Sequence, residues 1–257
     1  MKRKILLVEP KYKNKYPPIG LMKIATYHRM LGDNVVFFFK GDLKDFVVEN
    51  IYNKVLMKLK EIENGAVWEK RKTNIIKYIK TKNRNILDDI FEDSTQTQNR
   101  ILLTPWLNYY SDFYRKKEYV KKPYWDRVYI ATLFTFHWKI VVDTINFAKY
   151  LVNDINQIWV GGVMATVLSD EIEKEVGIKP YCGLLDKPGT LGDNDIVVDE
   201  LPLDYSILDE IDYKYPENDA YYSYMTRGCP RKCKYCAVPK IEPQYKSYIS
   251  IKKTLNI

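Results

Sequence analysis

Hydrophobic residues near the start of the chain follow the pattern of a β-strand, a helix and a second strand. Residues 4–9 form a short apolar run, and residues 10–18 after it are rich in Lys, Tyr and Pro. Apolar side chains over residues 19–31 recur at helical spacing, and Gly32 ends that helix. Residues 35–39 are apolar without alternation, which is typical of a strand covered on both faces. The first forty residues therefore predict a β-loop-α-β unit with parallel strands.

The same pattern of apolar strands and amphipathic helices returns after residue 126. Residues 127–133 and 157–162 have the length and apolar content of strands, and the second of them ends in a glycine pair. Residues 138–152 and 169–176 repeat their apolar side chains at helical spacing. These segments predict two further strands, each followed by a helix.

Two weaker strands, near residues 181–183 and 196–198, complete a predicted α/β domain that spans residues 1–212. Alternating strands and helices of this length predict a doubly wound, Rossmann- or flavodoxin-like parallel sheet. Ligands of such sheets bind at the carboxyl ends of the strands. The loops after the first, third and fourth strands are therefore expected to converge on a binding site.

Between the second and third predicted strands lies a segment, about residues 42–124, that does not fit the α/β pattern. Its apolar residues recur every three or four positions, which predicts amphipathic helices. Residues 94–99 read as a polar loop, and residues 101–119 as a further helix. We interpret the segment as a helical insertion, whose role as a structural cap or as a surface for a substrate or partner stays open.

The overall composition is that of a globular protein, with 46% hydrophobic and 29% charged residues. No apolar run approaches the roughly 18 residues that a membrane span needs, so we expect a cytoplasmic protein with no membrane partner. The formal net charge is +8, and the positive residues are spread through Lys-rich helical stretches. Solvated helix faces account for this pattern, which also leaves nucleic acid open as a partner.

Three of the four cysteines lie within eight positions, at Cys229, Cys233 and Cys236. A cluster this tight in a reducing compartment indicates a metal, because thiolates are soft ligands that favour zinc, copper(I) or iron–sulfur clusters. Structural zinc needs a fourth ligand. The candidates are distant in the sequence: Cys182, His28 and His137. A cubane iron–sulfur cluster held by three cysteines would instead leave one iron open.

The sequence around these cysteines resembles the signature of radical S-adenosylmethionine (radical SAM) enzymes. The resemblance rests on the Cys-x3-Cys-x2-Cys spacing after a predicted strand, on Tyr235 before the last cysteine, and on the flanks 226–228 and 237–239. It implies that Cys229, Cys233 and Cys236 hold a [4Fe–4S] cluster whose fourth iron is chelated by SAM. It also implies that Tyr235 contacts the SAM adenine, and that reductive cleavage of SAM gives a 5′-deoxyadenosyl radical. The substrate is unknown.

Basic residues surround the cysteines, namely Arg231, Lys232, Lys234 and Lys240. They read equally well as a solvated loop and as cations that stabilise thiolates and attract an acidic electron donor. The family resemblance implies a reductant protein such as a flavodoxin or ferredoxin as partner.

The first domain resembles the cobalamin-binding-type α/β domain that precedes many radical SAM barrels. Residues 16–21, 133–135 and 159–166 carry this likeness. Gly161 and Gly162 would let the backbone approach a bound cobalamin, although such a pair also occurs in simple strand-to-helix packing.

One departure from the cobalamin family is the absence of its Asp-x-His-x-x-Gly motif. Residues 11–15 stand in that place and include no histidine. His28 and His137 are interpreted as partly buried, hydrogen-bonded side chains instead. Cobalamin binding stays open on the sequence alone.

Residues 201–218 form a connector, and residues 219–226 a β-rich run that leads into the cysteines, while Lys246 onward resembles the start of a helix. By the resemblance, residues 213–257 would be the first strand and cluster loop of a (β/α) barrel, which needs about 200 residues when complete. We expect a radical SAM enzyme truncated early in its barrel, without a complete active site in this chain. The alternatives are a non-catalytic corrinoid- or partner-binding module with a vestigial cluster loop, and a zinc-bound, nucleic-acid-associated protein.

Overall fold

The computed structural model describes residues 2–12, 14–39, 41–62, 67–91, 97–217 and 219–248. The chain divides into two compact units, one of residues 1–41 with 124–257 and one of residues 42–123. The segment from residue 213 onward belongs to the same unit as the sheet. The two units are described separately below.

The first unit is built on a four-stranded sheet whose strands are all parallel. The strands are β1 (Lys4–Glu9), β2 (Asn34–Phe39), β3 (Arg127–Thr132) and β4 (Ile158–Gly162). Their order is β2-β1-β3-β4, with β1 paired to β2 on one side and to β3 on the other. The predicted parallel α/β fold is therefore confirmed.

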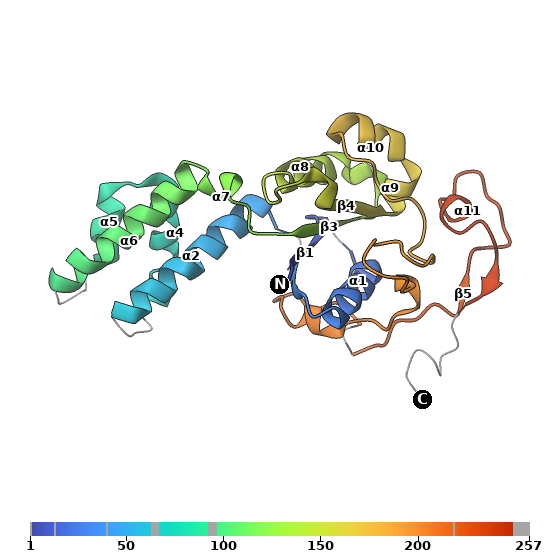
Figure 1. The fold of residues 1–257 in the computed structure, drawn as a ribbon, viewed down its shortest axis with the longest axis horizontal. Coiled ribbons are helices and arrows are strands. Elements are labelled where there is room, and N and C mark those ends of the chain that lie inside the picture. The colour runs from blue at the N-terminus through green and yellow to red at the C-terminus, as the bar shows by residue number, and fades with distance from the viewer. Residues whose placement is uncertain are drawn as a thin grey trace. The chain divides into compact units, whose positions relative to one another are not determined.

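Helices cover both faces of this sheet (Figure 1). The helix α1 (Ile19–Met30) lies on one face, while α8 (Trp138–Ala148), α9 (Val163–Val167) and α10 (Ser169–Val176) lie on the other. Ile5 and Leu7 belong to the cluster on the α1 side, whereas the alternating Leu6 and Val8 are fully buried outside that cluster. Burial on both faces explains why the middle of β1 is continuously apolar.

The two weaker strands predicted near residues 181–183 and 196–198 are wrong. The chain is irregular at both places, and residues 198–200 form a short 3₁₀ helix, η3. Tyr181 touches the sheet through one hydrogen bond, from its N–H to Val160 O at 2.8 Å. Leu191, Ile196 and Val198 pack instead on the α1-side core. Packing on the sheet face buries these apolar side chains, so the segments need no strand pairing to be buried. The other 3₁₀ turns are η1 (Thr135–His137), η2 (Ile155–Gln157) and η4 (Tyr205–Leu208).

The second unit is helical, as its apolar spacing predicts. Its helices are α2 (Leu43–Ile62), α3 (Val67–Lys70), α4 (Lys72–Thr81), α5 (Arg84–Phe91), α6 (Thr97–Arg115) and α7 (Glu118–Lys121). The single helix predicted over residues 101–119 is two helices, because Lys117 adopts a left-handed conformation (φ 52°) between α6 and α7. The predicted polar loop at 94–99 lies partly outside the described residues, and α6 already begins at Thr97.

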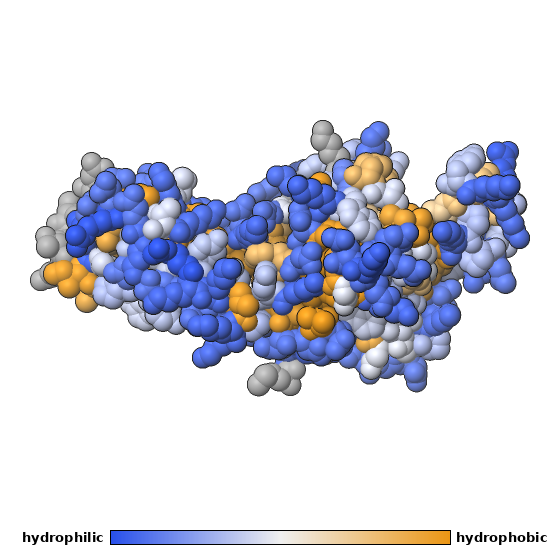
Figure 2. Space-filling view, turned by 90° about the horizontal axis from the view of Figure 1, so that it is seen from above, coloured by the Kyte–Doolittle hydropathy of each residue, from blue (hydrophilic) through white to orange (hydrophobic). Residues whose placement is uncertain are grey.

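Charged side chains of the second unit form exposed pairs. Lys60 contacts Glu69 at 2.6 Å, and Lys80 contacts Asp45 at 2.8 Å. Figure 2 shows a visible surface that is mostly hydrophilic, with separate hydrophobic patches. Such exposed pairs add little to stability, and they fit the interpretation of the Lys-rich stretches as solvated faces. None of the helices in the described ranges is both long and apolar enough to cross a bilayer.

The segment that carries the cysteines contains little regular structure. Two-residue strands β5 (Thr226–Arg227) and β6 (Lys246–Ser247) pair antiparallel, and α11 (Val238–Ile241) lies between them. Of the β-rich run predicted at 219–226, only Thr226 lies in a strand. Lys246 begins β6 and not a helix, and residues 249–257 lie outside the described residues. The barrel architecture stays a prediction.

Candidate functional site

A large pocket opens at the carboxyl ends of β1, β3 and β4. Its volume is about 1350 Å³, above the range of roughly 300–1000 Å³ that is usual for small-molecule sites. Its walls include Tyr12 after β1, Phe134 after β3 and Gly162 at the end of β4. The predicted convergence of these three loops is therefore confirmed, and the volume suits a cofactor-sized ligand.

Aromatic side chains line much of this pocket. They come from both the sheet and the segment near the cysteines: Tyr12, Tyr16, Tyr129, Phe134, Trp159, Tyr181, Tyr213, Tyr222 and Tyr224. Aromatic rings provide large apolar contact areas with polar edges. The pocket therefore favours a ligand with an extensive apolar surface.

The Gly161–Gly162 pair shapes one wall of the pocket, as the sequence predicts for close backbone approach. Gly162 has a φ of 112°, and a Cβ added to it would lie 2.2 Å from Thr132 O. The Thr132 hydroxyl donates to Gly161 O at 3.0 Å and accepts from Ala165 N at 2.9 Å. Position 162 therefore requires glycine, and Thr132, which the sequence pattern did not single out, holds the turn.

Glu9 places a buried carboxylate on the pocket wall at the end of β1. The residue is 1% exposed, and its Oε2 accepts a hydrogen bond from the Tyr215 hydroxyl at 3.0 Å. Burial raises the pKa of both Tyr12 and Tyr215, and the negative charge of Glu9 raises both pKa values further. Both phenols therefore stay protonated, so they can serve as hydrogen-bond donors.

The three clustered cysteines lie between β5 and α11. All are half-buried free thiols, and Tyr235 beside Cys236 is 93% exposed. In the part of the chain that the structure describes, no three His, Cys, Asp or Glu side chains are arranged to hold a metal ion. The donor set suits a soft metal, but binding would have to gather the thiols, since metal binding and local ordering are coupled.

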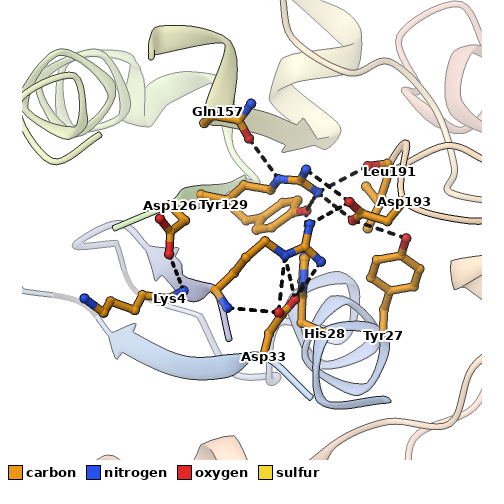
Figure 3. A network of polar contacts seen from close by, with 11 residues as sticks. Lys4, Tyr27, His28, Asp33, Asp126, Tyr129, Gln157, Leu191 and Asp193 are labelled. Carbon is orange, nitrogen blue, oxygen red and sulfur yellow. Dashed lines mark hydrogen bonds and ion pairs between the residues drawn. The ribbon is translucent and has the colours of Figure 1, made fainter. Parts of the chain in front are cut away.

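Among the described residues, the structure does not group the three candidates for a fourth zinc ligand with the cysteine loop. His28 is fully buried, with Nδ1 2.8 Å from Asp33 Oδ2 and Nε2 2.8 Å from the Tyr129 hydroxyl. Figure 3 shows His28 and Asp33 in a polar network near the amino ends of the strands. Burial, which outweighs the Asp33 hydrogen bond, lowers the pKa of His28 to about 4. The prediction of a hydrogen-bonded structural histidine is thus confirmed for His28.

Of the other two candidates, His137 is half-buried and Cys182 is exposed. His137 stacks on Tyr12, with ring centroids 5.5 Å apart. Cys182 is exposed, and its sulfur lies 3.9 Å from Ala165 O. In the described residues the structure therefore places neither of them in a metal-binding group with the cysteine loop.

A cluster of buried charges joins the pocket wall to the base of the cysteine loop. Lys23 on α1 lies 2.9 Å from Asp199, and Arg227 lies 2.8 Å from both Asp199 carboxylate oxygens. All three side chains are at most 8% exposed, and the three residues line the pocket. Burial raises the pKa of Asp199, but hydrogen bonds from Tyr248 and Lys23 and the charge of Arg227 lower it overall. The carboxyl therefore stays ionised in the folded protein.

Sequence reasoning missed this charged cluster, although a signal for it exists. Lys23 interrupts the apolar run 21–25 in α1, and Asp199 follows the apolar residues 196–198. A charge within a segment that must be buried needs a partner of opposite charge. Two such interruptions of opposite sign would have indicated an internal ion pair.

Val238, Ile241 and Glu242, which follow the cysteines, line the same pocket as the glycine pair of β4. Of the predicted site residues, the structure thus brings Gly161 and Gly162 into the pocket and places the cysteines on a loop whose far end borders it. Compared with models of protein families, with curated proteins and with solved structures, the chain matches none. The functional argument therefore rests on the residues of this chain.

Proposed function

We propose that the cysteine loop binds a [4Fe–4S] cluster and that the chain is a radical SAM enzyme or the amino-terminal part of one. The observation that carries this proposal is the set of three free, half-buried thiols at Cys-x3-Cys-x2-Cys spacing on one loop. Thiolates are the ligands of iron–sulfur clusters, and three of them leave one iron for SAM. The adjacent pocket offers space for a further ligand.

A cluster bound there would supply the electron that cleaves SAM to methionine and a 5′-deoxyadenosyl radical. Cys229, Cys233 and Cys236 are the proposed ligands, and the exposed ring of Tyr235 is available to contact the adenine. Arg231 and Lys232 are exposed beside the thiols. Their positive charge would attract an acidic reductant protein such as a flavodoxin or ferredoxin.

Anaerobic reconstitution with iron and sulfide tests this proposal. We expect four irons and four sulfides per chain, together with the visible absorbance of an iron–sulfur cluster. Replacing all three of Cys229, Cys233 and Cys236 with alanine should abolish both signals, whereas Cys182→Ala should leave them unchanged. Release of 5′-deoxyadenosine after SAM and dithionite are added would show that this chain itself holds the SAM site, whereas a cluster without that release would fit the amino-terminal part of such an enzyme. Bound zinc in place of iron, or the same absorbance in the triple variant, would reject the proposal.

The second candidate function is a non-catalytic corrinoid-binding module with a vestigial cysteine loop. The pocket favours it, because its volume and aromatic lining suit a large planar ligand and Gly161 and Gly162 form one wall. Neither histidine is among the described lining residues, so these residues offer no imidazole that could bind the cobalt of a cobalamin.

Titration with hydroxocobalamin, followed by its visible absorbance, tests the corrinoid site. We expect saturable binding by the wild-type chain. Gly161→Leu should weaken it by about tenfold, or ~1.4 kcal/mol, because the added side chain occupies the pocket. The variant should fold, since the nearest atom to a Cβ at position 161 is Tyr181 O at 4.0 Å. Absence of saturable binding, or equal affinity in both proteins, would reject this site.

A further inference from the structure

Glu242 ties together the two ends of the cysteine loop. Its Oε2 accepts a hydrogen bond from Gly228 N, directly before Cys229, and its Oε1 accepts one from Arg227 Nη1 at 2.9 Å. The pairing of β5 with β6 brings the same two segments together. A Cβ on Gly228 would lie 2.2 Å from Gln244 O, so the two backbones are in direct contact. Residues 228–242 therefore form a loop that is closed at its base.

The closed base is anchored in the α/β unit through Arg227. The carbon of its guanidinium lies 3.8 Å from the centre of the Tyr224 ring and 4.7 Å from the centre of the Tyr248 ring. Its Nη2 is bound by Asp199, which also accepts from Lys23 and Tyr248. The loop base thus rests on a buried, charge-paired support, whereas the thiols beyond it are half-exposed.

We propose that Glu242 is a positioning residue, which holds the cysteine loop in the closed form from which its three thiols can gather on one cluster. The inference rests on the proposed iron–sulfur function. Closing a loop of this length has an entropic cost that cluster binding would otherwise have to overcome. The contacts of Glu242 with Gly228 and Arg227 reduce that cost, because charge-assisted hydrogen bonds are roughly twice as strong as neutral ones.

Glu242 can be changed without removing the buried support. Its side chain is 18% exposed, and Arg227 keeps the Asp199 carboxylate as a partner when Glu242 is replaced. The Glu242→Ala variant removes both loop contacts, whereas Glu242→Gln keeps an oxygen that can accept from Gly228 N. Glu173 is an exposed acid on α10 and provides a matched control as Glu173→Ala.

The experiment measures thiol reactivity and iron loading in the full chain, with Cys182→Ser in every protein so that only the loop thiols react. We expect Glu242→Ala to speed the reaction of the apo-protein thiols with a disulfide reagent by roughly two- to tenfold, as loss of such hydrogen bonds implies. It should also bind less iron at limiting iron concentration and alter the electron paramagnetic resonance signal of the reduced cluster. Glu242→Gln should lie between Glu242→Ala and wild type, and Glu173→Ala should match wild type.

The two readouts separate this inference from the proposed function. If the wild-type chain binds no iron, the iron–sulfur proposal fails, while the thiol rates still report on the loop. If Glu242→Ala has wild-type thiol rates, the positioning role is overturned, even where a cluster forms. Faster thiols accompanied by a loss of circular dichroism would also overturn it, because Glu242 would then support the whole fold.

Discussion

Replacing Asp199 with alanine is expected to lower the free energy of unfolding by about 3–5 kcal/mol, because it removes the carboxylate that two buried cations share. Lys23 and Arg227 are 6% and 4% exposed, and both bind the Asp199 carboxylate. Tyr248 donates a further hydrogen bond to it. Urea denaturation followed by circular dichroism at neutral pH measures the effect.

The control for Asp199 is Asp195→Ala, an exposed acid four residues earlier, which should change stability by less than about 0.5 kcal/mol. The pH dependence provides a second check. The folded protein lowers the pKa of Asp199 below its ordinary 3.8, so its contribution is complete above that pH and is lost as the pH falls through the folded pKa. The difference between wild type and Asp199→Ala should therefore narrow in acid. An equal loss of stability in both variants at neutral pH would contradict the role of the buried cluster.

Gly162→Ala is expected to lower the free energy of unfolding by about 3 kcal/mol, since strain of this kind ranks among the larger effects of single substitutions. The φ of 112° is unfavourable for any residue with a Cβ, and that Cβ would lie 2.2 Å from Thr132 O. Relief would require β4 to move away from β3, because the obstacle is backbone and not a mobile side chain. Thermal unfolding and urea titration both measure the change.

The matched control for Gly162→Ala is Gly20→Ala, which should raise the free energy of unfolding instead of lowering it. Gly20 lies in α1 with an ordinary helical backbone, and an added Cβ meets no atom within 4 Å. Alanine should stabilise the protein there by about 0.5–1 kcal/mol, because glycine loses more conformational freedom on folding. If Gly162→Ala is also neutral or stabilising, the account of the β4 turn is wrong.

The strands of the sheet could be predicted because a buried strand needs several apolar residues in a row. Residues 35–39 are apolar at every position, and in β2 Val35 and Phe37 are buried while Val36 and Phe38 are partly buried. The same rule failed at residues 196–198, where apolar side chains pack on the α1-side core without joining the sheet. A short apolar run specifies that it must be buried, but not whether its backbone hydrogen bonds are made within a ladder.

The residues of the candidate site could be predicted from the sequence to different degrees. The glycine pair stands at the end of a predicted strand, and the three cysteines are adjacent, so each pattern is local. Thr132 and Glu9 carry no such pattern, because the features that matter are the turn that Thr132 holds and the pocket that Glu9 faces. Their roles depend on neighbouring strands, and strand order is not encoded at either position.

The sequence by itself determined the parallel α/β class, the presence of a helical insertion at about residues 42–124 and the grouping of three cysteines within eight positions. Each follows from side-chain type and spacing over a few residues. Only the tertiary structure decided that Lys23, Asp199 and Arg227 meet, across separations of 176 and 28 residues. Folding removes these charges from water, and burial is favourable only where opposite charges are brought together. The base of the cysteine loop is therefore set by the packing of the whole α/β unit.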